Sequence, residues 1–310
     1  MTDRTRRDAA QAGGIEPARR LSAHVEAAVL EPGLYLVATP IGAARDITLR
    51  ALDVLNSADM LAAEDTRVMR HLMDIHGVPL RGRRILSYHD HNAERQRPAI
   101  LAALEAGQSV AYASDAGTPL VADPGYRLAR DTAGAGARVH ALPGASAALV
   151  ALSLSGLPSD RFLFAGFPPA TRAARATWLR ELLKIDATLI LFESPRRVKQ
   201  TLEELCEIDA NRSTVVAREL TKRFEEVIRG TAGELAQDPR MAALKGEVVL
   251  LVDRQGDVQV DEDAIQAALA ARLGHMTVKD AAREVAQELG LARREVYQMA
   301  LKLDDEGNGH

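Results

Sequence analysis

The sequence predicts an α/β protein with two domains, followed by a small helical segment. Short apolar runs alternate with helix-like stretches, and the connections are short and rich in Gly and Pro, which is typical of a mostly parallel sheet. The 310 residues suffice for about two average domains. Hydrophobic residues make up 47% and charged residues 26% of the chain, so collagen-like, disordered and disulfide-stapled proteins are excluded.

Charge, cysteine content and the N-terminal residues limit the class further. The net charge of -4 argues against a surface coated in basic residues for non-specific nucleic-acid binding. The lone Cys206 forms neither an internal disulfide nor a cysteine-based zinc site, which favours a reducing cytosol. No apolar stretch approaches the roughly 20 residues of a membrane span, so we expect no membrane association. Residues 1–31 have no secretory signal and are predicted to be a disordered tail.

The first domain is predicted over residues 32–156. It begins with a buried strand over 34–38, which a turn over 39–42 (TPIG) stops. The same alternation continues downstream with a helix-like spacing over 46–55, a strand over 60–63, a helix over 91–105, a strand over 109–114, a helix over 125–133, a strand over 138–142 and a helix over 145–155.

The second domain is predicted over residues 157–256, after a Gly- and Pro-containing boundary at 156–161. Its strands are expected over 162–167, 188–193, 214–219, 225–230 and 247–253, and its helices over 171–184 and 195–206. Two consecutive strands near its end indicate an antiparallel portion. Residues 257–310 are predicted to be helical throughout, with Thr277 and Asp280 as an N-terminal cap pair and a last helix over 293–303.

The densest chemical signal is the loop over 114–125 (SDAGTPLVADPG), directly after a predicted strand. Open α/β sheets bind ligands at the carboxyl ends of their strands. Gly117 and Gly125 allow close approach of backbone, and Asp115 and Asp123 can accept hydrogen bonds. The alternative is a tight turn followed by a helix N-cap.

Two other strands end in similar loops, at 39–42 and 143–147. Neither is a phosphate loop, because no Lys-Ser/Thr pair follows, and the sequence has no GxGxxG for a dinucleotide. Each loop alone could be a structural turn. Three such loops at corresponding ends of neighbouring strands favour a ligand site.

A series of motifs in order along the chain makes the sequence recognisable: TPIG (39–42), AAEDTR (62–67), HDHN (89–92), SDAGTPLVADPGY (114–126), LPGASA (142–147), GLPSDRF (156–162), FESPRR (192–197), ARELTK (217–222) and KGE (245–247). This series closely resembles the bacterial ribosomal small-subunit 2′-O-methyltransferase family of the tetrapyrrole-methylase superfamily. The resemblance covers roughly 33–253, and residues 264–303 also look like that family's C-terminal helical domain. It implies the two-domain fold of class III S-adenosylmethionine methyltransferases.

The resemblance also implies an activity and a cofactor site. The activity is methyl transfer from S-adenosyl-L-methionine to the ribose 2′-hydroxyl of a decoding-region cytidine in 16S rRNA of the 30S subunit, by a cytoplasmic homodimer and without a metal. The implied cofactor contacts are Pro40, Gly42, Asp115, Gly117, Thr118, Pro119, Leu120, Ser146, Ala147, Phe192 and Ala217. One departure is Ala43-Ala44, where many relatives carry Asn-Leu, so a side-chain amide contact is absent or replaced there.

A ribose hydroxyl is a weak acid, so a general base would assist its attack. The candidates are Glu64, Asp65, His89, Asp90, His91, Glu193, Glu219 and Lys222, of which Glu193 and Glu219 are favoured because each ends a strand. The alternative for the AEDTR acids is a helix start, with Arg67 pairing one of them. The His-Asp-His cluster could bind a metal, but an orienting or helix-capping role fits a tandem in an extended loop better.

RNA binding requires local positive charge despite the acidic total. Residues 161–184 contain five basic residues and one acid, which suggests a phosphate track, although a solvated helix face would look the same. Arg196, Arg197, Lys222, Arg67 and His89 are the predicted RNA contacts. Residues 257–310 carry six basic and eleven acidic residues, so packing against protein is expected there.

Two other functions remain compatible with the sequence. A tetrapyrrole-type small-molecule methyltransferase would use the same cofactor loops, although the motifs of the ribosomal branch speak against it. A non-catalytic RNA-binding or ribosome-assembly factor could keep the fold, but all three cofactor loops are retained.

Overall fold

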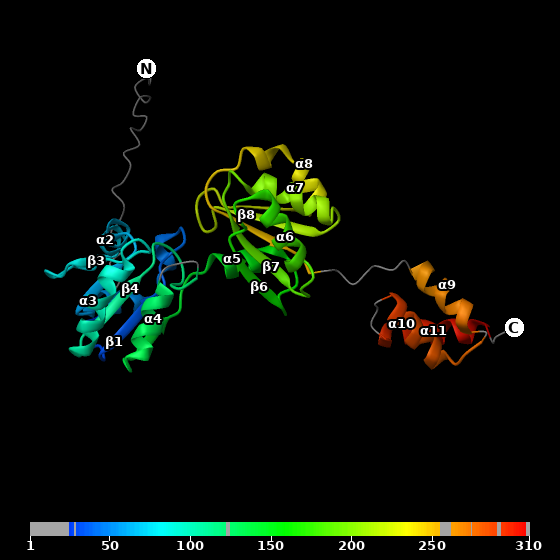
Figure 1. Cartoon of the computed structure of the whole chain (residues 1–310), viewed down its shortest axis with the longest axis horizontal. Helices are drawn as coiled ribbons and strands as arrows, with labels where there is room; N and C mark the ends of the chain where they lie inside the picture. The colour runs from blue at the N-terminus through cyan, green and yellow to red at the C-terminus, as the bar shows by residue number, and fades with distance from the viewer. Residues whose placement is uncertain are drawn as a thin grey trace, which may run out of the picture. The chain divides into compact units, whose positions relative to one another are not determined.

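The computed structural model describes residues 25–27, 29–121, 125–254, 262–273, 275–289 and 293–307. The chain forms two compact units that divide between Ala147 and Ala148. Figure 1 labels the helices and strands that belong to them. Within the described ranges, no helix is long and apolar enough to cross a membrane.

The first unit contains a sheet of five parallel strands in the order β3-β2-β4-β1-β5. The strands are β1 (Gly33–Val37), β2 (Met60–Ala63), β3 (Ile85–Ser87), β4 (Ser109–Ala113) and β5 (Val139–Leu142). The connecting helices are the short 3-10 helix η1 (Ala44–Asp46), α1 (Leu49–Ser57), α2 (Thr66–Ile75), α3 (Ala93–Glu105) and α4 (Gly125–Gly134).

Side-chain alternation along β1 explains why helices cover both faces of this sheet. Tyr35 and Val37 pack in one cluster with residues of α1 and α2. Leu34 and Leu36 point to the other face and pack with residues of α3 and α4. Because successive residues of a strand face opposite sides, an apolar run such as LYLV requires cover on both. The predicted parallel α/β architecture is confirmed.

The second unit contains a mixed sheet in the order β6-β7-β10-β8-β9. Its strands are β6 (Phe162–Gly166), β7 (Thr188–Glu193), β8 (Ser213–Arg218), β9 (Glu226–Thr231) and β10 (Val248–Val252). β6 and β7 are parallel, whereas β10 runs antiparallel to β7 and β8, and β9 runs antiparallel to β8. The expected antiparallel portion is therefore present. Helices α6 (Arg172–Leu182), α7 (Val198–Ile208) and α8 (Ala232–Gln237) pack on one face, and η2 (Pro239–Ala242) follows α8.

Helix α5 (Ala147–Ser155) lies almost entirely in the second unit, whereas the sequence placed it in the first, with the boundary at 156/157. The side chain of Arg229 on β9 explains the difference. Ile228 faces α6–α8, so the next residue faces the opposite side of the sheet. There the Arg229 guanidinium donates to the carbonyl oxygens of Ser155, at 3.0 Å, and of Leu154. These bonds use carbonyls at the end of a helix, which have no partners within it.

The C-terminal helices α9 (Glu262–Leu273), α10 (Val278–Leu289) and α11 (Arg293–Gly307) form their own small core, which includes Leu269, Val285 and Ala300. The predicted cap pair is confirmed. The Asp280 backbone N–H donates to Thr277 Oγ1 at 3.2 Å, and that hydroxyl donates to the Asp280 carboxylate at 2.7 Å.

Other parts of the chain differ from the prediction. The sequence did not predict β3 and α8 as elements, and α2 was weighed only as an alternative. Part of the predicted tail contacts the first unit: Val25 and Leu30 pack against its core, and Glu31 pairs with Arg138 at 2.5 Å. Residues 1–24 and the loop position Asp123 lie outside the described residues.

Candidate active site

The loops after β1 and β4 meet at the point in the first sheet where the strand order reverses. The chain leaves β1 toward β2 on one side, and leaves β4 toward β5 on the other, although β1 and β4 are neighbours. Ligands of open α/β sheets bind outside the carboxyl ends of the strands at such a point. The loop after β5 joins them, since β5 is the other neighbour of β1.

Hydrogen bonds connect these three loops. Thr39 and Gly117 pair through reciprocal backbone N–H···O contacts of 3.0 Å. The Thr39 hydroxyl also donates to the Ser114 carbonyl at 3.1 Å. The Thr118 hydroxyl donates to the Ala145 carbonyl at 3.0 Å, which ties the β4 loop to the β5 loop. The structure therefore brings together the three loops that the sequence singled out.

Backbone geometry in these loops explains why glycine is required at two positions, and it shows one leucine in a left-handed conformation. Gly117 has φ +82°, in the left-handed region that glycine adopts at no steric cost. A Cβ on Gly144 would lie 2.6 Å from the Ala38 Cβ, so only glycine permits this approach of the β5 loop to the end of β1. Leu120 has φ +72°, a conformation that is costly for a leucine and that often marks functional loops.

Asp115 connects the β4 loop to the AEDTR motif after β2. Its Oδ1 accepts a hydrogen bond of 2.7 Å from the Asp65 backbone N–H. The Asp65 carboxylate caps α2 by accepting from the Arg67 N–H at 2.8 Å, and it pairs with the Arg67 guanidinium at 2.6 Å. The side chain and backbone of Arg67 lower the pKa of Asp65 to about 2. The helix-start alternative is thus confirmed, and an acid this strong is a poor proton acceptor at neutral pH.

The HDHN motif lies at the same edge, after β3. Asn92 organises its turn: its side-chain oxygen accepts from the His89 N–H at 2.9 Å, and its amide donates to the Ser87 carbonyl at 3.1 Å. His89 Nε2 lies 3.0 Å from the Asn92 amide nitrogen. In the described part of the chain, no group of three or more potential ligand side chains could hold a metal ion.

The predicted cofactor contacts of the first unit differ in accessibility. Gly117 and Pro119 are buried, Pro40, Thr118, Leu120, Ser146 and Ala147 are half-buried, and Gly42 and Asp115 are exposed. Together they offer carboxylate, hydroxyl and backbone groups next to apolar side chains. That set suits a ligand with amino, hydroxyl and aromatic parts better than a phosphate.

The predicted contacts of the second unit lie on its sheet. Phe192 is half-buried on β7, and its ring packs edge-on against Phe164 and Phe167, with centroids 4.8 and 5.7 Å away. Ala217 is completely buried on β8, opposite Val249 of β10. Only backbone groups of Ala217 could therefore meet a ligand.

The surroundings of Glu193 argue against a role as a free base. Its carboxylate is buried at the end of β7 and is fully engaged within the second unit. It accepts hydrogen bonds from the Thr201 hydroxyl at 2.7 Å and the Ser194 N–H at 2.7 Å, and its Oε1 lies 3.0 Å from Arg197 Nε. Arg197, predicted to contact RNA, thus neutralises a buried acid.

Glu219 is also engaged, together with Lys222. Glu219 has φ +49°, and its carboxylate accepts from the Glu247 N–H and the Lys222 ammonium, both at 3.0 Å. The Glu247 N–H and Lys222 hold the pKa of Glu219 below its ordinary value. Burial lowers the pKa of Lys222, but its bonds to Glu247 and Glu219 outweigh this effect and raise the pKa. Glu219 is thus better placed to hold Lys222 than to accept a proton.

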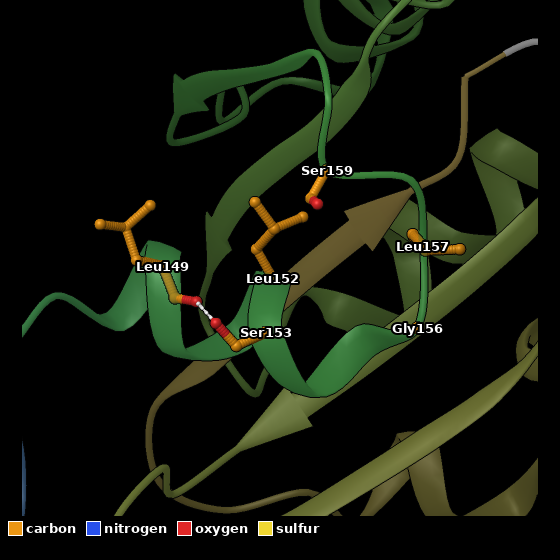
Figure 2. A pocket seen from close by; sticks show the side chains of 6 residues that line it. All are labelled: Leu149, Leu152, Ser153, Gly156, Leu157 and Ser159. Carbon is orange, nitrogen blue, oxygen red and sulfur yellow. Dashed lines mark hydrogen bonds between the residues drawn. The ribbon is translucent and has the colours of Figure 1, made fainter.

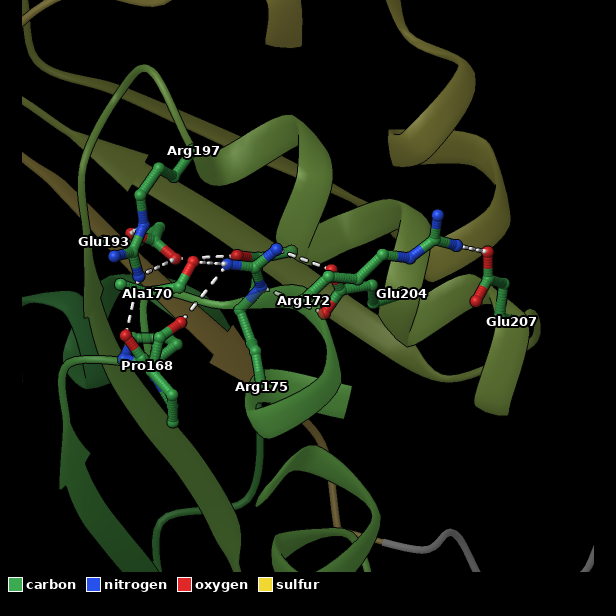
Figure 3. Close-up of polar contacts among 10 residues, drawn as sticks. Pro168, Ala170, Arg172, Arg175, Glu193, Arg197, Glu204 and Glu207 are labelled. Atoms are coloured by element: carbon green, nitrogen blue, oxygen red, sulfur yellow. Dashed lines mark hydrogen bonds and ion pairs between the residues drawn. The ribbon is translucent and has the colours of Figure 1, made fainter. Parts of the chain in front are cut away.

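Most cations of the predicted phosphate track over 161–184 have acidic partners, which already neutralise part of their charge. Arg175 is buried and forms a two-point ion pair with Glu204. Arg172 pairs with Glu207 at 2.5 Å (Figure 3). Arg161 and Lys184 pair with Asp186 and Glu181, both at 2.8 Å. Helix periodicity alone could not distinguish these pairs from free charges.

A separate pocket of about 420 Å³ lies between α5 and the segment that follows it in the second unit (Figure 2). Its lining has no titratable side chain, so it offers no acid or base. The lining residues are Leu149, Leu152, Ser153, Gly156, Leu157 and Ser159.

Comparison with known proteins assigns this fold to a class of enzymes. Residues 33–236 match the tetrapyrrole (corrin/porphyrin) methylase family. The fold is similar to that of diphthine synthase (TM-score 0.56, 17% identity, 71% of this chain and 89% of that one). It is also similar to that of uroporphyrin-III-C-methyltransferase from Thermus thermophilus (TM-score 0.51, 22% identity, 72% and 94%). These likenesses establish the fold of class III S-adenosylmethionine-dependent methyltransferases.

More similar relatives narrow this class. The chain is 48% identical to ribosomal RNA small subunit methyltransferase I of Mesorhizobium japonicum, over 92% of this chain and 98% of the relative. The relatives of that name from Escherichia coli O157:H7 and Bacillus subtilis are 41% and 38% identical, over 87% and 85% of this chain and 94% and 92% of their own lengths. Residues 259–304 match the C-terminal helix-turn-helix domain of the same family. The chain belongs to the ribosomal RNA small subunit methyltransferase I family.

Proposed function

We propose that this methyltransferase transfers the methyl group of S-adenosylmethionine to the ribose 2′-hydroxyl of a decoding-region cytidine in 16S rRNA. The observation that carries the proposal is the extent of the similarity to relatives named for small-subunit ribosomal RNA. It spans both α/β units and the C-terminal helices rather than the cofactor loops alone. A shared cofactor site by itself would not separate RNA from small-molecule substrates.

The loops of the first unit fit the cofactor by their chemistry. S-adenosylmethionine supplies a methyl group already activated by its positive sulfur. Exposed Asp115 provides a carboxylate that can accept a hydrogen bond from an amino or hydroxyl group. The left-handed backbone at Gly117 and Leu120 turns the neighbouring peptide groups in directions that an extended strand does not allow. The bonds of Thr39 and Thr118 hold these loops in place before a ligand arrives.

Positioning of the ribose hydroxyl is expected to provide most of the rate acceleration. Methyl transfer is an in-line displacement, and holding the two reactants in line removes much of its entropic barrier. Three of the candidate bases, Asp65, Glu193 and Glu219, are ion-paired. These groups act mainly by holding Arg67, Arg197 and Lys222.

A methylation assay tests this function. Purified protein with S-adenosylmethionine should methylate 30S subunits from a strain that lacks it, at one ribose 2′-oxygen, and far faster than naked 16S RNA. A net-acidic protein does not hold free RNA tightly, whereas the assembled particle presents the cytidine in a fixed shape. Methylation of a base, or equal rates on naked RNA, would contradict the proposal.

The tetrapyrrole alternative is tested in the same assay by offering uroporphyrinogen-type substrates beside 30S subunits.

We further propose that the protein is cytoplasmic and forms a homodimer. Light scattering of the purified protein would test the dimer. In the domain scheme of 32–156, 157–256 and 257–310, removal of residues 257–310 should spare cofactor binding and reduce activity on the particle. Loss of cofactor binding in the folded, shortened protein would contradict that division.

A further inference from the structure

Two exposed phenylalanine side chains lie at one edge of the second sheet. Phe167 directly follows β6, and Phe224 lies in the loop between β8 and β9; their exposed fractions are 61% and 62%. β6 and β7 are parallel, and β7 and β8 both run antiparallel to β10. The carboxyl ends of β6, β7 and β8 therefore share an edge, and both rings belong to it. Leaving two large apolar rings in water is unfavourable unless something covers them.

The loop that presents Phe167 is held by three consecutive carbonyl groups. Arg197 Nη2 donates to the Pro168 carbonyl at 2.7 Å, and Arg175 Nη1 donates to the Pro169 and Ala170 carbonyls at 3.2 Å (Figure 3). Two carboxylates on neighbouring elements fix these guanidinium groups, as Figure 3 shows. Burying charges is costly. The buried charges therefore hold a surface loop whose first residue is the exposed Phe167.

Positive side chains predominate among the charges at this edge that lack an ion-pair partner; Glu225 is the acid among the described residues there that also lacks one. In the described ranges, Arg196, Arg223 and Lys245 are exposed and have no acidic partner within ion-pair distance. The acids nearby are engaged: Lys222 binds Glu219 and Glu247, and the Thr221 N–H donates to Glu225 at 2.7 Å. The Arg223 guanidinium lies 5.5 Å from the centroid of the Phe224 ring. Exposed rings among cations attract a partner that is both aromatic and anionic.

We propose that this edge binds single-stranded RNA by base stacking, with one base on Phe167 and one on Phe224. The proposal rests on the proposed function and names the surface that would hold nucleotides next to the methylated one. Stacking of bases on aromatic side chains within a cationic groove is how proteins bind single strands without reading sequence. Duplex RNA has its bases stacked internally and does not offer their faces.

Fluorescence anisotropy with two labelled RNA probes of equal length tests the proposal. One probe is a short oligoadenylate, and the other has the same backbone without bases. Phe167→Ala and Phe224→Ala should each weaken oligoadenylate binding by about 5- to 140-fold. Binding of the abasic probe should change less than about 2-fold, because its phosphates are unaltered. Phe167→Trp should keep the affinity, since a larger ring also stacks.

Phe162→Ala is the matched control. Phe162 is also exposed, at 43%, but it begins β6 and so lies at the opposite edge of the sheet. Its replacement should leave binding of both probes unchanged. Equal losses on both probes, or equal losses in Phe162→Ala and Phe167→Ala, would overturn the stacking assignment.

Calorimetry with S-adenosylmethionine separates an RNA base from the adenine of the cofactor. Cofactor affinity should be unchanged in both alanine variants, and a loss in either one would assign that ring to the cofactor and overturn the proposal. Methylation of 30S subunits by the wild-type protein is measured in parallel. If the wild type methylates the particle and both variants match it on every probe, this inference fails while the proposed function stands.

Discussion

The buried pair of Arg175 and Glu204 offers a quantitative test of how the second unit is held together. Both side chains are nearly inaccessible, at 2% and 3% exposed, and two contacts of 2.5 and 2.9 Å join them. Glu204→Gln keeps the shape but removes the charge that compensates the guanidinium. Breaking such a pair from one side costs about 3–5 kcal/mol. Because glutamine retains one acceptor, we expect a loss near 3 kcal/mol.

Urea unfolding followed by tryptophan fluorescence measures this loss. The chain has a single tryptophan, Trp178, which lies on α6 and packs against the core of the second unit. Its signal therefore reports on the unit that contains the pair. Glu207→Gln is the matched control, since it breaks the Arg172–Glu207 pair between the same two helices, where the side chains are 71% and 55% exposed. That change should cost at most about 1 kcal/mol.

Comparing the two variants shows whether the buried Arg175–Glu204 pair stabilises the second unit more than the exposed pair does. If Glu204→Gln costs less than about 1 kcal/mol, or no more than Glu207→Gln, the buried pair does not stabilise the unit as described. The double variant Arg175→Met/Glu204→Leu should recover part of the loss, because it removes both charges. It should stay below wild type, since the Pro169 and Ala170 carbonyls each lose a hydrogen bond worth about 0.5–1.5 kcal/mol.

Three further predictions concern the second unit. Gly246→Ala should lower stability by about 1–3 kcal/mol in urea, because its Cβ would lie 2.2 Å from Glu219 Oε1 and the backbone has φ +85°; an unchanged midpoint would contradict this. Glu219→Gln should be less stable than wild type at pH 7, and the gap should narrow as the solution is made acidic. The lowered pKa of Glu219 means that its bonds to the Glu247 N–H and to Lys222 stabilise the fold above about pH 4 and are lost as the pH falls through that pKa; a gap that does not narrow in acid would refute this. Arg196→Ala should make the slope of log affinity against log salt for single-stranded RNA shallower by about 0.7, without loss of stability. Arg197→Ala should instead lower the urea midpoint, since that guanidinium neutralises the buried Glu193 carboxylate. A lower midpoint in Arg196→Ala and a shallower salt slope in Arg197→Ala would contradict this assignment.

Features that depend on local pattern can be predicted from the residues alone. The apolar run at 34–38 predicts a buried strand wherever it lies in the chain, because such residues need cover on both faces. The loops at 39–42, 114–120 and 143–147 follow such strands, and parallel pairing alone brings their ends to one edge. The cap at Thr277 is equally local, since its partner is three residues away. These features placed the candidate cofactor loops and, with the motif series, indicated the family.

Which charges and rings are available to a ligand depends on contacts between residues that are far apart in the chain. Arg175 and Arg180 lie on the same helix, yet Arg175 is buried against Glu204 and Arg180 is exposed. The partner of Arg175 lies 29 residues away, so nothing in the local sequence distinguishes the two. In the same way, α5 joined the second unit because Arg229, more than 70 residues downstream, binds its last carbonyls. The energy of a charge depends on which groups folding brings beside it, and a linear pattern does not contain that information.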